Sequence, residues 1–188
     1  EHRVKLAADS TGRRVLQDVR RAGQPDHGVG ALLEVLRTDV DVEHRGVRVL
    51  NHEELGNGDV SLAYVSKLLK RRFTDAPTLR KVLQTIWYQV NNGQEIYVIG
   101  SVLDDGTVRG GTGWGAEFAK ICNKPLHVFD QEHDNWFTWD GDAFVKRAAG
   151  DGPVITHPHF TGTGTRRMQD NGRAAIEALF TRSFGAAS

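Results

Sequence analysis

From position 59 onward, apolar residues recur at helical spacing in two successive segments. Asp59 is a predicted helix N-cap, because its short polar side chain precedes an apolar face. A second helix is predicted to start at Pro77, a residue favoured in the first turn, and to end at Gly93. The apolar faces of the two helices consist of Leu62, Val65, Leu68 and Leu69, and of Leu79, Val82, Leu83, Ile86 and Val90.

Residues 95–100 and 125–130 are short, nearly continuous apolar runs bounded by turn residues. This pattern is typical of strands that are buried on both faces. Between the two runs, a turn is predicted at 104–106, and the glycines of 110–113 precede a helix with the apolar residues Ala116, Phe118, Ala119 and Ile121.

After a predicted β-hairpin, the rest of the chain repeats the order of strand, glycine-rich loop and helix. Residues 136–139 and 143–145 predict a β-hairpin, and 154–155 predict a last short strand. A second glycine-rich loop at 162–165 then introduces a helix with Met168, Ala175, Ile176, Leu179 and Phe180. Two units of strand, glycine loop and helix predict a Rossmann-like α/β fold, in which an open parallel sheet has helices on both faces and a small β-hairpin insertion.

Residues 1–58 give weaker signals. Helical spacing is visible at 15–19 and 30–36, and 47–50 reads as a short strand. No N-terminal strand followed by a glycine-rich loop is predicted here. We expect a single Rossmann-like domain over 1–188, with its core at 59–184 and an adapted segment before it.

The composition is that of a globular protein and disfavours nucleic-acid-binding and membrane-spanning proteins. The 188 residues include 39% hydrophobic and 26% charged residues, which is typical of a globular chain. Twenty-four basic residues balance 24 acidic ones, so no overall field attracts nucleic acid or an anionic membrane. Cys122 is the only cysteine, and no apolar run approaches the roughly 20 residues of a membrane span. We therefore expect a soluble cytoplasmic protein that does not bind membranes.

The loop Gly110, Gly111, Thr112 and Gly113 is the first candidate site. A helix N-terminus presents unpaired N–H groups and a partial positive charge, and glycines let a phosphate approach the backbone. Gly100 and Ser101 end the preceding strand, at the same predicted edge of the sheet. A phosphate-bearing nucleotide is the ligand that this pattern favours.

The run Gly110-Gly-Thr-Gly-Trp-Gly-Ala-Glu117 resembles the Gly-Gly-x-Gly-Thr-x-x-Glu signature of the LONELY GUY-type phosphoribohydrolases, the lysine decarboxylase-like proteins. Their superfamily includes the DNA-processing protein DprA and the YpsA-like Rossmannoid proteins. Residues 59–184 are most similar to small YpsA-like members, and the resemblance implies a nucleotide-binding core there. Trp114 departs from the signature, which has threonine at this position.

The resemblance implies that Glu117 is catalytic. Its carboxylate would lie beside the ribose and stabilise an oxocarbenium-like state or activate a water. The alternative is an acidic residue that merely suits the helix dipole. The hydrolases also use an arginine on the helix before the strand, and Thr85 occupies that position here.

Two further candidates follow the other predicted strands. Gly162, Thr163, Gly164, Thr165 and Arg166 could hold a second phosphate group, or Thr165 could be a helix N-cap. Asp130 could accept a ribose hydroxyl or cap the following turn.

Other chemistry is not predicted. His157 and His159 lack a third ligand at a supporting spacing, so we expect no metal, and no other cofactor is indicated. The tryptophans Trp87, Trp136 and Trp139 are expected in the core, as is Cys122, and the basic run 70–72 is expected to be a solvated helix end. The resemblance implies a homodimer, with Trp87 and Tyr88 at its interface.

These observations lead to three hypotheses. The first is a protein that binds a nucleotide or a nucleotide-derived metabolite and hydrolyses or transfers at the N-glycosidic bond of a nucleoside monophosphate. The second is a non-catalytic module that senses or carries such a nucleotide. The third and weakest is single-stranded DNA binding, which the balanced charge disfavours.

Overall fold

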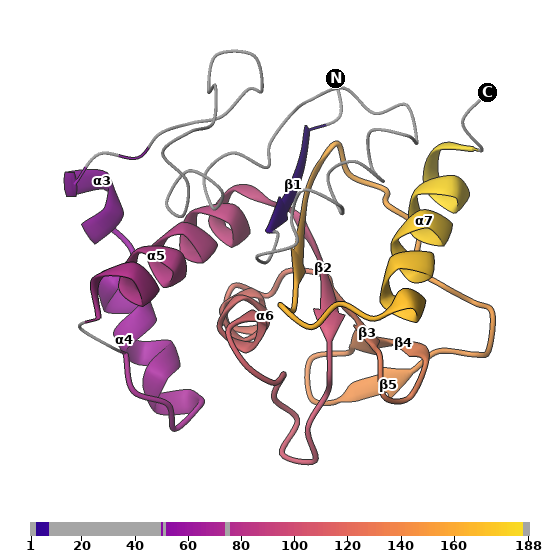
Figure 1. Ribbon diagram of the computed structural model, residues 1–188, viewed down its shortest axis with the longest axis horizontal. Coiled ribbons are helices and arrows are strands. Elements are labelled where there is room, and N and C mark those ends of the chain that lie inside the picture. Colours follow the sequence, from indigo (N-terminus) through magenta and orange to yellow (C-terminus); the bar gives the residue numbers. More distant parts are fainter. Residues whose placement is uncertain (1–2, 8–49, 51, 74–75, 186–188) are drawn as a thin grey trace.

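The computed structural model describes residues 3–7, 50, 52–73 and 76–185. The helices predicted at 15–19 and 30–36 lie outside the described residues, as does most of the strand predicted at 47–50. Within the described part, six strands form one sheet in the order β1-β6-β2-β3-β4-β5 (Figure 1). The strands are β1 (Arg3–Ala7), β2 (Glu95–Gly100), β3 (Leu126–Asp130), β4 (Asn135–Trp139), β5 (Phe144–Lys146) and β6 (His159–Gly164).

The sheet is mixed. The strands β1, β6, β2 and β3 run parallel, whereas β4 and β5 pair antiparallel at one edge. The α/β class and the hairpin at 136–145 are therefore confirmed. The two runs at 95–100 and 125–130 are the predicted neighbouring parallel strands, in the register Val98↔Val128 and Gly100↔Asp130.

The strand β1 was not predicted, since the sequence indicated no N-terminal strand followed by a glycine-rich loop; the residues directly after β1 lie outside the described part of the chain. β1 pairs with β6 along its whole length, with Val4 opposite Phe160 and Leu6 opposite Gly162. The sequence Arg-Val-Lys-Leu-Ala alternates polar and apolar residues, as an edge strand does, but five residues are a weak signal.

The described helices are α3 (His52–Gly56), α4 (Asp59–Leu68), α5 (Pro77–Asn92), α6 (Thr112–Ile121) and α7 (Asp170–Phe184). The predicted helices α4, α5 and α6 are confirmed. Asp59 is not an N-cap, because Gly58 takes that position and the Asp59 carboxylate accepts hydrogen bonds from Arg80 and Gln84 at 2.5 and 2.7 Å. None of the helices in the described part of the chain is both long and apolar enough to cross a membrane.

The segment before α7 also differs from its prediction. Residues 154–155 are not in a strand, whereas 162–164 belong to β6, and α7 begins only at Asp170. β6 lies between β1 and β2, and its β-branched residues Thr161 and Thr163 are buried. Pairing on both sides holds this glycine-containing segment extended, so it does not form the predicted loop.

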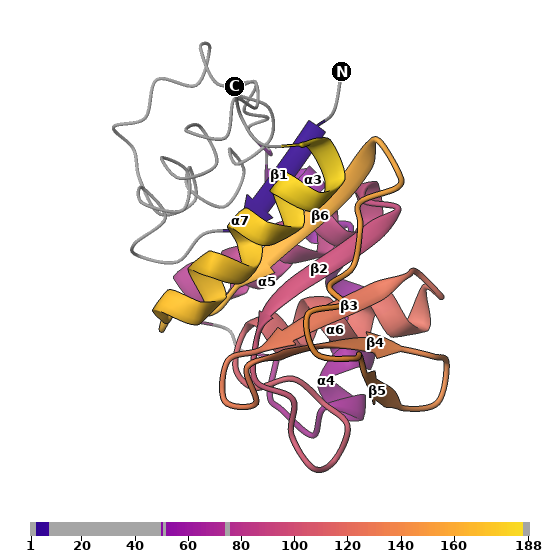
Figure 2. The same cartoon turned by 90° about the vertical axis from the view of Figure 1, so that its right-hand side faces the viewer.

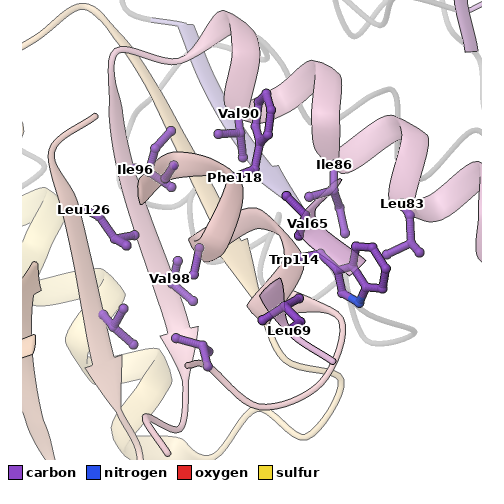
Figure 3. Close-up of a cluster of buried hydrophobic side chains, with 14 of the residues drawn as sticks. Val65, Leu69, Leu83, Ile86, Val90, Ile96, Val98, Trp114, Phe118 and Leu126 are labelled. Carbon is purple, nitrogen blue, oxygen red and sulfur yellow. The ribbon is translucent and has the colours of Figure 1, made fainter. Parts of the chain in front are cut away.

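Two hydrophobic clusters pack against β2. Its residues Ile96 and Val98 belong to a cluster with side chains of α4, α5 and α6, most of which are labelled in Figure 3. The alternate residues Tyr97 and Ile99 belong to a second cluster with side chains of α7. Figure 2 shows α7 running along β6 and β2. The helices that follow β2 and β6 are thus anchored in different clusters.

Candidate functional site

The candidate site is the edge at which β2, β3 and β6 end. The parallel register places Gly100 beside Asp130 and Ile99 beside Gly164. The amide of Thr165 donates a hydrogen bond to the carbonyl of Ile99 at 2.9 Å, so the chain after β6 starts beside the end of β2. Gly162 and Thr163 lie further back, inside β6.

The glycines of the first loop serve two purposes. Gly110 has φ +72°, a conformation that favours glycine, and Gly111 is the N-cap residue of α6 with an ordinary φ of −66°. A Cβ atom at either position would meet no other described atom within 4 Å, and both residues are exposed. The backbone at Gly110 and Gly111 is therefore open to a ligand at the start of α6.

The other two glycines are required by packing. A Cβ at Gly113 would overlap the carbonyl oxygen of Val108 and lie 2.5 Å from the Arg71 guanidinium. A Cβ at Gly100 would lie 3.2 Å from Val108 Cγ1 and 3.5 Å from Thr112 Oγ1. The Thr112 side chain is buried, and its hydroxyl donates to the carbonyl of Arg109 at 2.9 Å. Gly100, Thr112 and Gly113 thus fix the shape of the loop.

Arg71 was expected in a solvated helix end, and the structure corrects this expectation. Its guanidinium donates to the carbonyls of Gly110 at 2.9 Å and Val108 at 3.0 Å, and to the Thr107 hydroxyl at 3.4 Å. The missing side chain of Gly113 leaves room for it. Arg71 therefore fastens the loop before α6 to the end of α4, with its charge close to the first turn of α6.

Asp130 is fully buried, at 0% exposure, and has the capping role. Its carboxylate accepts hydrogen bonds from the amides of Val102, Glu132 and His133 at 2.9, 2.8 and 3.1 Å, and from Nδ1 of His133 at 2.9 Å. Burial acts to raise the pKa of Asp130, but these hydrogen bonds outweigh it and hold the pKa below its ordinary value. The carboxylate is therefore ionised, and each of its oxygens already accepts two hydrogen bonds.

Ser101 joins the same network. Its hydroxyl donates to Glu132 Oε1 at 3.2 Å, and Arg109 forms an ion pair with the same oxygen at 2.8 Å. The loop after β2 is thereby tied to the turn after β3 through both Asp130 and Glu132.

Glu117 lies apart from this edge. It is five residues along α6 from Thr112, a rise of about 7.5 Å at 1.5 Å per residue. Its side chain is 14% exposed and forms an ion pair with Lys120 at 3.2 Å. The Lys120 ammonium also donates to the carbonyl of Gly106 and lies 4.0 Å from the centre of the Trp139 ring. Glu117 is thus paired with a lysine that binds the carbonyl of Gly106, and its predicted catalytic role stays a prediction.

The residues after β6 approach the edge without forming a helix start. The Thr165 hydroxyl accepts a hydrogen bond from the amide of Arg167 at 3.3 Å, and Arg166 is exposed. Thr165 is not the predicted N-cap, since Gln169 takes that position before α7. Thr165 and Arg166 are therefore brought to the edge, on a short irregular segment.

Gln131 is a buried polar residue of this edge that the sequence pattern did not indicate. Its buried amide accepts a hydrogen bond from the Gln169 amide at 2.7 Å and donates to the Arg167 carbonyl at 3.3 Å. Gly172 makes room for it, because a Cβ there would lie 2.5 Å from Gln131 Oε1. The signal in the sequence is slight: a glutamine directly after the strand ending in Asp130.

The remaining predicted residues divide between core and surface. Trp136 is buried, Trp87 and Trp139 are half-buried, and Cys122 is exposed, which corrects its assignment to the core. Thr85 is buried within α5, and its hydroxyl donates to the carbonyl of Lys81 at 2.8 Å. Within the described residues, no group of three or more histidine, cysteine, aspartate or glutamate side chains could hold a metal ion.

Comparisons with protein-family models, curated proteins and solved structures found no match to the chain. The chemistry of the site must therefore be inferred from its own residues.

Proposed function

We propose that the chain is a Rossmann-like domain that binds the phosphate of a nucleotide or a nucleotide-derived metabolite at the edge formed by the ends of β2 and β6. The helices that follow these neighbouring strands pack in different hydrophobic clusters. In open α/β sheets, ligands bind where the connections of adjacent strands diverge to opposite faces. The divergence of α6 and α7 supports this location.

The observation that carries the proposal is the open backbone at Gly110 and Gly111 in front of α6. The helix dipole favours an anion at this end. The amides of Gly113 and Trp114 donate to the carbonyls of Gly110 and Gly111 at 3.3 and 3.1 Å, so the amides that we assign to the ligand are those of Gly110, Gly111 and Thr112. The guanidinium of Arg71, which is bonded to two carbonyls and a hydroxyl, adds positive charge beside the first turn. Thr165 and Arg166 after β6 would contact the same ligand from the other side.

The test is the substitution Gly111→Asp. It adds a carboxylate where phosphate is expected, so it should abolish binding of adenosine monophosphate, measured by calorimetry, without unfolding the chain. Gly56→Asp is a matched control, because a Cβ at Gly56 also meets no described atom within 4 Å. Unchanged affinity in the Gly111→Asp variant would remove this loop from the site.

A non-catalytic module that senses or carries the nucleotide is the alternative, and two observations favour it over catalysis by Glu117. The Glu117 carboxylate is paired with Lys120 below the loop at Gly106. The position assigned to the hydrolases' arginine is taken by buried Thr85, where an arginine would enter the core. Both observations support the non-catalytic alternative, and catalysis by Glu117 stays a prediction.

The homodimer and the cytoplasmic location stay proposals. Trp87 and Tyr88 pack internally, since Trp87 contacts Phe118 and the Tyr88 hydroxyl donates to the carbonyl of Glu54 at 2.7 Å. Light scattering that gave a monomer mass would contradict the homodimer.

A further inference from the structure

The chain contains three Asn-Gly pairs, at 57–58, 92–93 and 171–172. In this dipeptide the backbone nitrogen of the glycine can attack the side-chain carbonyl carbon of the asparagine, because glycine has no Cβ to obstruct the approach. The attack closes a five-membered ring. It therefore needs a glycine amide without a hydrogen-bond partner and an asparagine backbone that is not held in a helix.

Asn57 meets both requirements. It is exposed and lies in the turn between α3 and α4, on the side of the molecule opposite α7 (Figure 1). The amide of Gly58 donates no hydrogen bond to any described residue. The Asn57 side chain is oriented by a hydrogen bond from Nδ2 to the Tyr88 hydroxyl at 3.1 Å, which leaves the carbonyl carbon open to attack. Because α3 has only five residues, the turn after it opens at a low cost in free energy.

The other two pairs are held by helices. Asn92 is the last residue of α5, and the amide of Gly93 donates to the carbonyl of Gln89 at 3.1 Å. Asn171 lies in the first turn of α7, and its Nδ2 donates to a backbone carbonyl and to a carboxylate, both at 3.0 Å. In both pairs, hydrogen bonds of the folded chain must break before the ring can close.

We propose that Asn57 is a site of spontaneous deamidation, a covalent modification that the fold permits at this pair and suppresses at the other two. The Gly58 nitrogen forms a bond to Cγ of Asn57, and its proton passes through solvent to the leaving nitrogen. The Cγ–Nδ2 bond breaks and ammonia leaves. Water then opens the cyclic imide at either of its carbonyls, so the products are aspartate and the β-linked isoaspartate. One water is consumed and one ammonia is released, without oxidation or reduction.

The modification changes the junction of α3 and α4. It places a carboxylate directly before α4 and, in the β-linked product, lengthens the main chain by a methylene group. Gly58 packs so closely on the Trp87 ring that a Cβ would lie 2.6 Å from ring atoms, so the junction has no room for a longer main chain. The hydrogen bond from Nδ2 to Tyr88 is also lost. After modification, proteolysis between α3 and α4 should be faster.

The experiment incubates the full, folded chain in mildly alkaline buffer and follows each Asn-Gly pair by peptide mapping with mass spectrometry. Asn57 should convert at least about fivefold faster than Asn92 or Asn171, the factor expected for one hydrogen bond that must break first. In guanidinium chloride, where the unfolded chain exposes all three pairs, the three rates should agree within about twofold.

Asn57→Gln is the test variant, because a glutamine would have to close a larger ring and reacts far more slowly. It should remove the main acidic species that ion exchange separates from the aged protein, whereas the matched control Asn92→Gln should leave that species in place. Conversion of Asn57 no faster than that of the other two in the folded chain would overturn the proposal. The same holds for a ranking that persists after unfolding, or for a main acidic species that survives Asn57→Gln.

Discussion

The stretches 110–113 and 162–165 have similar compositions of glycine and threonine, yet they occupy different structures. The first is a turn in front of α6, with an exposed backbone and a positive φ at Gly110. The second is largely strand β6, paired with β1 on one side and with β2 on the other. The contacts of each stretch determine its structure. Hydrogen bonds from the Arg71 guanidinium hold the turn, whereas pairing with two adjacent strands holds the other stretch extended. The same composition therefore forms an exposed turn in one place and a paired strand in the other.

The largest expected effect is a difference in the free energy of unfolding between alanine substitutions at two glycines of the first stretch, Gly113 and Gly111. Gly113→Ala should lower the free energy of unfolding by about 2 to 4 kcal/mol, because the new Cβ overlaps the Val108 carbonyl. Gly111→Ala should cost less than about 1 kcal/mol, because no described atom lies within 4 Å of its Cβ. Urea unfolding measures both. An equal loss of stability in the two variants would contradict the close contact between Gly113 and the Val108 carbonyl.

Removing the Arg71 guanidinium should have an intermediate effect on the free energy of unfolding. Arg71→Met eliminates the hydrogen bonds to Val108 and Gly110 and should cost about 1 to 2 kcal/mol. Proteolysis within the loop 101–111 should become faster, while β6 stays protected. Lys70→Met, an exposed neighbour, serves as control and should change stability by less than about 0.5 kcal/mol. An unchanged rate of proteolysis in Arg71→Met would show that the hydrogen bonds of Arg71 do not stabilise the loop.

The smallest expected effect is a change with pH in the stability difference caused by Asp130→Asn, and this change occurs in the acid range. The folded-state pKa of Asp130 is depressed below the ordinary value of 3.8, so its contribution to stability is complete above that value and is lost as the pH falls through the folded-state pKa. The stability difference between wild type and Asp130→Asn should therefore shrink below about pH 4. Urea unfolding at several pH values measures it. A difference independent of pH would contradict the ionised cap.

The sequence predicted those elements whose signal is local. The buried strands at 95–100 and 126–130, the amphipathic helix from Pro77 and the turn before α6 were all readable from apolar spacing and glycine. The strand β1 depends on pairing with a segment more than 150 residues away, and the extended state of 162–164 depends on pairing with both β1 and β2. No local pattern encodes that pairing.

The same limit applies to the site. The position of Gly110, Gly111 and Thr112 at the start of a helix could be predicted from the sequence, and their binding of phosphate stays a proposal. The partners of Arg71 and Gln131 lie 36 to 40 residues away in the chain, so their roles appear only in the folded structure. For Glu117 the sequence motif predicted a ligand contact, which stays a prediction, whereas the ion pair with Lys120 appears only in the folded structure.

The most direct measurement of the central claim is a titration of the ¹⁵N-labelled chain with adenosine monophosphate, followed through the backbone amide resonances. We expect the largest shifts at Gly110, Gly111, Thr112 and Gly113, with further shifts at Thr165 and Arg166 and none at the amino end of β6. Shifts confined to other parts of the chain, or no shifts at saturating nucleotide, would contradict it.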